Sequence, residues 1–320
     1  MKIDSFGAPT MVTWQLTRDC NLACLHCCTD SAPGKALPHE LSRERSLSLC
    51  REIAAAGVPY AMIVGGEPTL VPHFAEVCKA LSDGGVLLKI ETNGMAFDVS
   101  ALKGLAVRSV QISIDGATQE TFAKQRPGGD LAKVLASCRA VRAAGFPLEI
   151  TFAPTRLNIH EADAVIELSV ELGAFRFNTG ELMRLGTAAK LWDRLVPSAA
   201  QYAVFLELLE RREAELAGKI ELCFRPFSLE EEAKGRRHEP SGTLLILPDG
   251  HVKVTAPLPY TCCDLTRHTF LEAWDAYRKA WSDPRITNGL AHLTADPAFA
   301  AKANQWVSLD SLSHDLPVVV

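Results

Sequence analysis

Short apolar segments rich in β-branched residues alternate with longer segments of helical periodicity from residue 11 to about residue 178. Six segments have the length and composition of strands: 12–16, 60–64, 86–91, 110–114, 148–152 and 175–178. The helical segments between them are 42–56, 72–82, 131–144 and 158–172. Strands that each lead into a helix predict an α/β fold with a parallel sheet. The sheet is either open and doubly wound or a partial barrel, and both place ligands at the carboxyl ends of the strands.

Local signals predict where some of these elements begin and end. Gly145 can supply the left-handed residue that ends a helix. Asn158 and Glu161 have the spacing of a capping box that opens the next helix. The charged stretch from Glu230 to His238 is interpreted as a solvated linker or loop.

The chain is expected to divide near Gly218, which gives a first domain of residues 1–217 and a second of residues 218–320. The second contains two expected strands around Pro248-Asp249-Gly250, a hairpin signal, and one amphipathic helix. These three elements are residues 243–247, 251–255 and 269–281. The last segment, 283–320, could cover the mouth of a barrel or pack at a dimer interface.

Ten cysteines are present in a chain of 320 residues with a net charge of −5. That charge gives no reason to expect a nucleic acid or an anionic membrane as partner. The N-terminus lacks a signal sequence and no apolar run is long enough to span a bilayer, so we expect a cytoplasmic protein. Because that compartment is reducing, clustered cysteines are better interpreted as metal ligands than as disulfides.

Cys20, Cys24 and Cys27 follow the first predicted strand with the spacing Cys-x3-Cys-x2-Cys. Three thiolates in one loop can bind one soft metal centre. A cubane iron-sulfur cluster normally takes four thiolates, so three would leave one iron open to a small chelating ligand. The alternative is a structural zinc site completed by Cys28 or His26.

Polar and glycine-rich motifs follow the next strands in the same way. They are Gly65-Gly66-Glu67-Pro68, Glu91-Thr92-Asn93-Gly94, Ser113-Ile114-Asp115-Gly116 and, after the sixth strand, Arg184. Each alone could be an ordinary turn or a helix cap. In this order and after the cysteine loop, they resemble the radical SAM superfamily over residues 10 to 190.

This resemblance implies a partial (β/α)6 TIM-like barrel with a small α+β C-terminal extension. It implies one 4Fe-4S cluster on Cys20, Cys24 and Cys27, and S-adenosylmethionine bound by the cluster. The implied contacts to S-adenosylmethionine are His26, Gly65, Gly66, Glu67, Thr92, Asn93, Ser113 and Asp115. Arg184 is a further candidate, as a carboxylate clamp, by its charge and position alone. A reductase, flavodoxin or ferredoxin would supply the electron that cleaves S-adenosylmethionine to a 5'-deoxyadenosyl radical.

Residues 240 to 281 resemble the SPASM or twitch extension of peptide-modifying members, but the cysteines expected on either side of the hairpin are missing. We therefore expect no auxiliary cluster, and a redox-neutral reaction or quenching of the substrate radical by a hydrogen donor. The candidate donors are Cys223, Cys262 and Cys263, although the ordinary interpretation of each one is a buried structural thiol.

The expected substrate is a peptide, because the SPASM-like part and residues 27–34 are similar to maturases of ribosomal peptides. Only about ten residues precede the first strand, so no leader-recognition domain is expected. A small-molecule tailoring reaction such as decarboxylation, dehydration or epimerisation is the first alternative. A non-enzymatic iron-sulfur or zinc-binding module is the alternative of another class.

Overall fold

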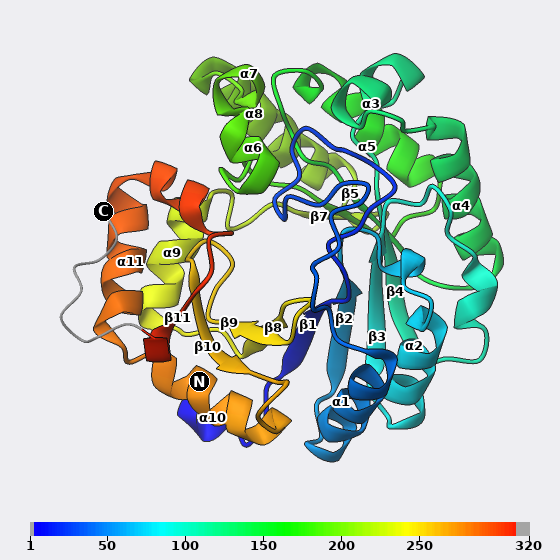
Figure 1. Ribbon diagram of the computed structural model, residues 1–320. Coiled ribbons are helices and arrows are strands. Elements are labelled where there is room, and N and C mark those ends of the chain that lie inside the picture. Colours follow the sequence, from blue (N-terminus) through cyan, green and yellow to red (C-terminus); the bar gives the residue numbers. More distant parts are fainter. Residues whose placement is uncertain (1–2, 312–320) are drawn as a thin grey trace.

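A computed structural model describes residues 3–311 and shows one curved sheet with helices on its outer face (Figure 1). Seven strands run parallel to their neighbours in chain order, and the first six are those that the alternation of the sequence predicts. They are β1 (Met11–Gln15), β2 (Tyr60–Val64), β3 (Leu87–Thr92), β4 (Val107–Ser113), β5 (Leu148–Thr151), β6 (Arg176–Asn178) and β7 (Glu221–Cys223). The curvature decides between the two expected arrangements in favour of a partial barrel.

The helices that connect these strands pack on the outside of the sheet (Figure 1). They are α1 (Arg43–Ala55), α2 (Phe74–Asp83), α3 (Gln119–Gln125), α4 (Leu131–Ala143), α5 (Ala162–Glu171), α6 (Gly186–Lys190), α7 (Trp192–Leu195) and α8 (Ala199–Glu215). Alternate strand residues such as Val12 and Trp14 are buried beneath them, together with Leu49 of α1. The hydrophobic core therefore lies between the sheet and its helices, which leaves the inner face of the sheet for other side chains.

The C-terminal part extends the same sheet at its other edge, because β8 (Thr243–Ile246) pairs in parallel with β1. β9 (His251–Lys253) pairs antiparallel with β8 and confirms the predicted hairpin. Gly250 in its turn has φ +88°, a backbone conformation that favours glycine. The remaining elements are β10 (Tyr260–Asp264), α9 (Leu229–His238), α10 (Phe270–Ala280), α11 (Pro284–Ala295), a 3-10 helix (Pro297–Lys302) and β11 (Val307–Ser308).

The expected boundary near Gly218 falls just before β7, which pairs with β6. The chain passes from β7, next to β6, through α9 to β8, which pairs with β1. β7 and β8 thus flank the strands β1 to β6 on opposite sides. The two-domain division stays a proposal about the chain's organisation.

Two local predictions are wrong. Residues 230–238 belong to helix α9, because Ser228 caps its first turn, acidic residues follow, and basic residues occupy the last turn, which suits the helix dipole. Asn158 and Glu161 form no capping box: the Asn158 amide donates to Asp115 O at 3.1 Å, and the Glu161 carboxylate accepts from Ala117 N at 2.7 Å. Both side chains form hydrogen bonds with residues distant in the sequence, so neither forms the local cap.

Candidate active site

The loop that follows β1, residues 17–31, carries the cysteine triplet and is called the cysteine loop below. The three thiols affect one another. Burial raises the pKa of Cys24 to about 12, and the thiols of Cys27 and Cys20 act in the same direction. Burial also raises the pKa of Cys20, and Cys27 adds to that effect. The three residues that the sequence singles out thus lie in one loop, and their thiols influence one another electrostatically.

Each of the three sulfurs accepts an N–H hydrogen bond from the protein. The pairs are Leu22 N with Cys20 Sγ at 3.4 Å, Arg126 Nη1 with Cys24 Sγ at 3.6 Å, and Ser31 N with Cys27 Sγ at 3.3 Å. Asn93 Nδ2 lies 3.6 Å from Cys20 Sγ as well. Such donors stabilise thiolates, and hydrogen bonds to sulfur are among the features that set the potentials of iron-sulfur clusters. The donor set thus fits an iron-sulfur cluster held by three thiolates.

A single metal ion requires a different arrangement of its ligands from that of a cluster. A tetrahedral zinc ion needs all its thiolates within about 2.3 Å of one point. Among residues 3–311, no three His, Cys, Asp or Glu side chains are arranged to hold one ion. The thiolates of a cubane bind separate irons, so they do not have to converge on one point.

Gly65 and Gly66, at the end of β2, lie against the backbone of the cysteine loop. Gly66 N donates to Thr17 O at 2.7 Å, and Glu67 N donates to Asp19 O at 2.9 Å. A Cβ on Gly66 would be only 2.2 Å from Asp19 O. The close approach of these two backbones therefore requires a glycine here.

The Glu67 carboxylate is 1% exposed and joins the ends of β2 and β3. It accepts hydrogen bonds from Thr69 Oγ1 at 2.6 Å, Thr92 Oγ1 at 2.8 Å and Asn93 N at 2.8 Å. Burial raises the pKa of Glu67. Thr92 and Asn93 are thus brought to Glu67 as the sequence predicts, and its role as a counter-charge to a bound ammonium stays a prediction.

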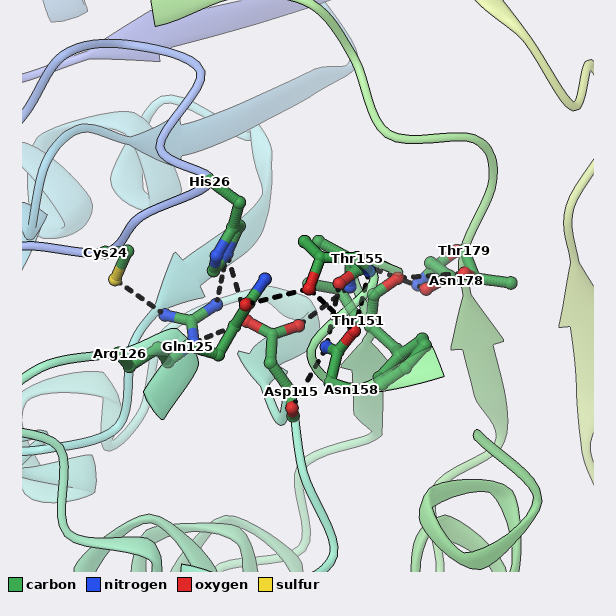
Figure 2. Close-up of polar contacts among 12 residues, drawn as sticks. Cys24, His26, Asp115, Gln125, Arg126, Thr151, Thr155, Asn158, Asn178 and Thr179 are labelled. Atoms are coloured by element: carbon green, nitrogen blue, oxygen red, sulfur yellow. Dashed lines mark hydrogen bonds and ion pairs between the residues drawn. The ribbon is translucent and has the colours of Figure 1, made fainter. Parts of the chain in front are cut away.

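Asp115, just after β4, is fully buried and contacts Arg126 and His26 (Figure 2). Its Oδ2 accepts from Arg126 Nε at 2.6 Å and lies 3.0 Å from His26 Nε2, while its Oδ1 accepts from Ala153 N at 2.7 Å. Burial opposes ionisation, yet Arg126 and His26 hold the pKa of Asp115 well below its usual range. Asp115 is therefore linked to the cysteine loop in two ways: Arg126 also contacts Cys24, and His26 belongs to the loop.

Arg126 was not identified from the sequence. It follows α3, is 6% exposed, and its guanidinium lies between Asp115 and Cys24 in Figure 2. Its only local signal is the turn Pro127-Gly128-Gly129 that follows it. Nothing in that signal indicates a partner 102 residues earlier.

Ser113 and Arg184 are placed differently. Ser113 is the last residue of β4 and shares the inner face with Gln111 and Thr151, and its hydroxyl has no hydrogen-bond partner within residues 3–311. Arg184 lies over the Trp192 ring at 5.2 Å, and its buried Nε has no partner in the described chain. Both can still receive a ligand group, so their predicted roles stay open.

The inner face of the sheet is polar. Glu149 is fully buried there and accepts from Lys89 Nζ at 2.9 Å, Ser109 Oγ at 2.6 Å and Asn178 Nδ2 at 3.0 Å. Gln111 continues the network, since its Nε2 donates to Glu91 Oε1 at 2.8 Å. A barrel interior lined by such groups suits a hydrogen-bonding substrate better than an apolar one.

The three candidate hydrogen donors are not equivalent in the structure. Cys223 pairs with Asn178 across β6 and β7, so it shares the inner face. Cys262 lines a cavity of about 600 Å³ with Ala276 and Ala280 of α10, on the outer side of the sheet. Cys263 lies opposite outward-facing Val252 at a β-bulge. This register supports Cys223 better than Cys262 or Cys263 as the hydrogen donor, and the role of each thiol stays a prediction.

Cys28 lies near an unusual lysine. Lys253 of β9 is 3% exposed, and its Nζ donates to Ala256 O at 2.7 Å and Ala303 O at 2.8 Å. Burial lowers the pKa of Lys253 to about 7, and Cys28 opposes this shift. Burial raises the pKa of Cys28 to about 12. No local pattern in the sequence indicates this electrostatic effect, because the two residues are far apart in the chain.

All ten cysteines are free thiols. Within residues 3–311, no helix has the length and apolar character needed to cross a bilayer.

Comparison with known proteins gives one family. Residues 14–168 match the radical SAM superfamily.

The mycofactocin maturase MftC of Mycobacterium ulcerans is 35% identical over 66% of this chain and 58% of its own length. The AdoMet-dependent heme synthase of Methanosarcina barkeri is 33% identical over 56% of this chain and 52% of its own. The PqqA peptide cyclase of Ruegeria pomeroyi is 30% identical over 68% and 59%. The matches thus span little more than half the length of these relatives.

A solved structure supports the fold. Streptococcus suis SuiB, bound to the precursor peptide SuiA, superposes with a TM-score of 0.65 over 89% of this chain and 67% of SuiB, at 13% identity. The shared architecture includes the C-terminal part of the chain as well as the barrel.

Proposed function

The chain belongs to the radical SAM superfamily, and on this premise we propose that it cleaves S-adenosylmethionine reductively and abstracts a hydrogen atom from a peptide. One observation supports the proposal: three thiols of one loop each accept an N–H hydrogen bond, and this loop contacts the segments that follow β2, β3 and β4. When bound, the cluster and S-adenosylmethionine would supply a 5'-deoxyadenosyl radical.

The residues of this chain would hold and shield those groups. Cys20, Cys24 and Cys27 would bind the cluster, and Arg126 would keep a positive charge beside Cys24. Gly66 and Glu67 fix the loop after β2 against the cysteine loop. The buried Arg184 Nε has no partner within residues 3–311, and Ser113 faces the interior at the end of β4, so both could contact the polar groups of S-adenosylmethionine. The sheet and its helices would exclude water from the reaction.

A peptide substrate is supported by the likeness to a PqqA peptide cyclase and to the maturase MftC. The polar inner face can form hydrogen bonds to peptide groups. The likeness to an AdoMet-dependent heme synthase favours the second candidate, a small-molecule reaction. We keep Cys223 as the proposed hydrogen donor, because it alone of the three candidates faces inward.

We further propose that the C-terminal part is SPASM-like and that a flavodoxin, ferredoxin or reductase in the cytoplasm donates the electron. The hairpin of β8 and β9 followed by β10 and α10 supports the first point.

The experiment is S-adenosylmethionine cleavage by the full chain, reconstituted anaerobically with iron and sulfide and reduced with dithionite. We expect 5'-deoxyadenosine from the native chain and none from Cys24→Ala, because the variant lacks one of three cluster ligands. Cys138→Ala is the matched control, since Cys138 lies on the buried face of α4, away from the cysteine loop. Equal product from Cys24→Ala, or none from the native chain, would overturn the proposal. A stable bound metal without cleavage would instead favour the non-enzymatic module.

A further inference from the structure

The C-terminal arm of the cysteine loop, Cys27 to Asp30, is held by two elements outside the family-matched residues 14–168. Thr187 N, in the first turn of α6, donates to Cys27 O at 2.8 Å. Asn304 Nδ2, near the C-terminus, donates to Cys28 O at 2.8 Å. Gly186 is packed so closely that a Cβ would lie 2.6 Å from each of these two carbonyls. The backbone that follows Cys27 is therefore fixed from both sides.

Asp30 is the second point of attachment. It has φ +59°, and among residues 3–311 it is the one residue other than glycine with a positive φ. This conformation persists where the surroundings hold it. Lys190 Nζ lies 2.5 Å from Asp30 Oδ1, and Asn304 Nδ2 lies 3.2 Å from Asp30 Oδ2. The single amide of Asn304 therefore spans Cys28 O and the Asp30 carboxylate.

Asn304 is itself held in place by its neighbours in the segment 297–308, called the strap below. Ala303 O accepts from the buried ammonium of Lys253 at 2.8 Å. Trp306 lies under the Arg18 guanidinium at 5.9 Å. Val307 begins β11, which pairs with β10. Because the strap is attached on both sides of Asn304, its amide is already oriented toward the cysteine loop.

The residues around Asp30 reach the sulfur of Cys27. Ser31 N lies 3.3 Å and Thr29 Oγ1 3.4 Å from Cys27 Sγ. A shift of Asp30 would move both neighbours and so change the hydrogen bonds to this sulfur. Hydrogen bonds to sulfur affect both the retention and the potential of an iron-sulfur cluster.

We propose that Asn304 is a positioning residue for the iron-sulfur cluster: through Cys28 O and Asp30 it keeps the Cys27 thiol and its donors in place. The strap thereby completes a site whose ligands all come from the N-terminal third of the chain. This inference rests on the proposed function, since it requires Cys27 to be a cluster ligand.

The test uses the full chain reconstituted without S-adenosylmethionine, and it follows iron release to a chelator and the EPR spectrum of the reduced cluster. We expect Asn304→Ala to release iron about 10-fold faster than the native chain and to alter the spectrum. Gln305→Ala is the matched control, because Gln305 is exposed on the same strap and its side chain has no partner within residues 3–311. The unfolding midpoint of the apo-proteins shows whether each variant folds.

Asn304→Asp gives a second, independent variant. It places a carboxylate beside Asp30 and removes the donor to Cys28 O, so we expect release at least as fast as in Asn304→Ala. Adding Asp30→Asn removes the like-charge contact, and the double variant should hold iron longer than Asn304→Asp alone.

Iron release and spectra identical to those of Gln305→Ala in both single variants would overturn the inference. So would a double variant no better than Asn304→Asp. Failure of the native chain to bind any cluster is a separate result, because it would overturn the proposed function itself.

Discussion

Arg126 contacts groups from two distant parts of the chain and joins them electrostatically. Its Nε binds Asp115 after β4, and its Nη1 reaches Cys24 in the cysteine loop. Burial opposes the charge, yet Asp115 raises the pKa of Arg126 above its ordinary value. The guanidinium therefore stays charged in a buried place, where its fork can serve a carboxylate and a sulfur together.

Replacing Arg126 tests this pairing. We expect Arg126→Gln to lower the free energy of unfolding by about 3–5 kcal/mol, because Asp115 is left buried with one partner fewer. Arg126→Lys should lose less, since it keeps the charge. Urea unfolding of the apo-protein measures both.

The Arg126→Gln, Asp115→Asn double variant closes the cycle, and we expect it to recover much of the loss. Strictly additive effects of the two substitutions would show that the pair is not coupled.

Among the elements, β9 carries a buried lysine, Lys253, beside apolar residues. The register with β8 places Lys253 beside Leu245 on the inner face, while Val252 packs outward. Lys253 uses two N–H groups to join the turn after β9 to the strap. The strand thus packs Val252 in the core and connects the turn after β9 to the strap through Lys253.

Lys253 should give the apo-protein a distinctive pH dependence. Burial lowers its pKa to about 7, whereas an unfolded chain has a lysine pKa of about 10.4. Between these values the unfolded chain binds more protons, so this residue makes the free energy of unfolding rise with pH. Relative to Lys253→Met, the native chain should therefore gain stability from about pH 7 to about pH 10.

Urea unfolding at several pH values measures this difference, with the exposed Lys103→Met as control. A difference between the native chain and Lys253→Met that is independent of pH would contradict the assignment of the shift to Lys253.

At the scale of the whole molecule, one sheet of eleven strands connects the N-terminal and C-terminal parts. The C-terminal strands continue from β1, the strand that leads into the cysteine loop. The strap then returns to that loop at Asn304. The two parts therefore meet at the site, even though the family match ends at residue 168.

The number of irons tests how many clusters the molecule carries. We expect about four irons per reconstituted chain, because three thiols form one ligand set and the C-terminal thiols Cys262 and Cys263 point away from the interior. Cys20→Ala should lose most of the iron, and Cys262→Ala should keep it. About eight irons per native chain would contradict the single-cluster prediction.

The sequence by itself determined the order of the first six strands and the main helices between them, the cysteine triplet and the loops after β2, β3 and β4. These features depend on periodicity and on residues close together in the chain, so local patterns contain them. Only the tertiary structure decided that α9 is a helix, that Cys223 shares the inner face, and that Arg126 and Asn304 contact the cysteine loop while Lys253 contacts the strap. Their partners lie far away in the sequence, up to 276 residues for Asn304 and Cys28. Such contacts arise only when the sheet closes, because its curvature brings the strap and the cysteine loop together.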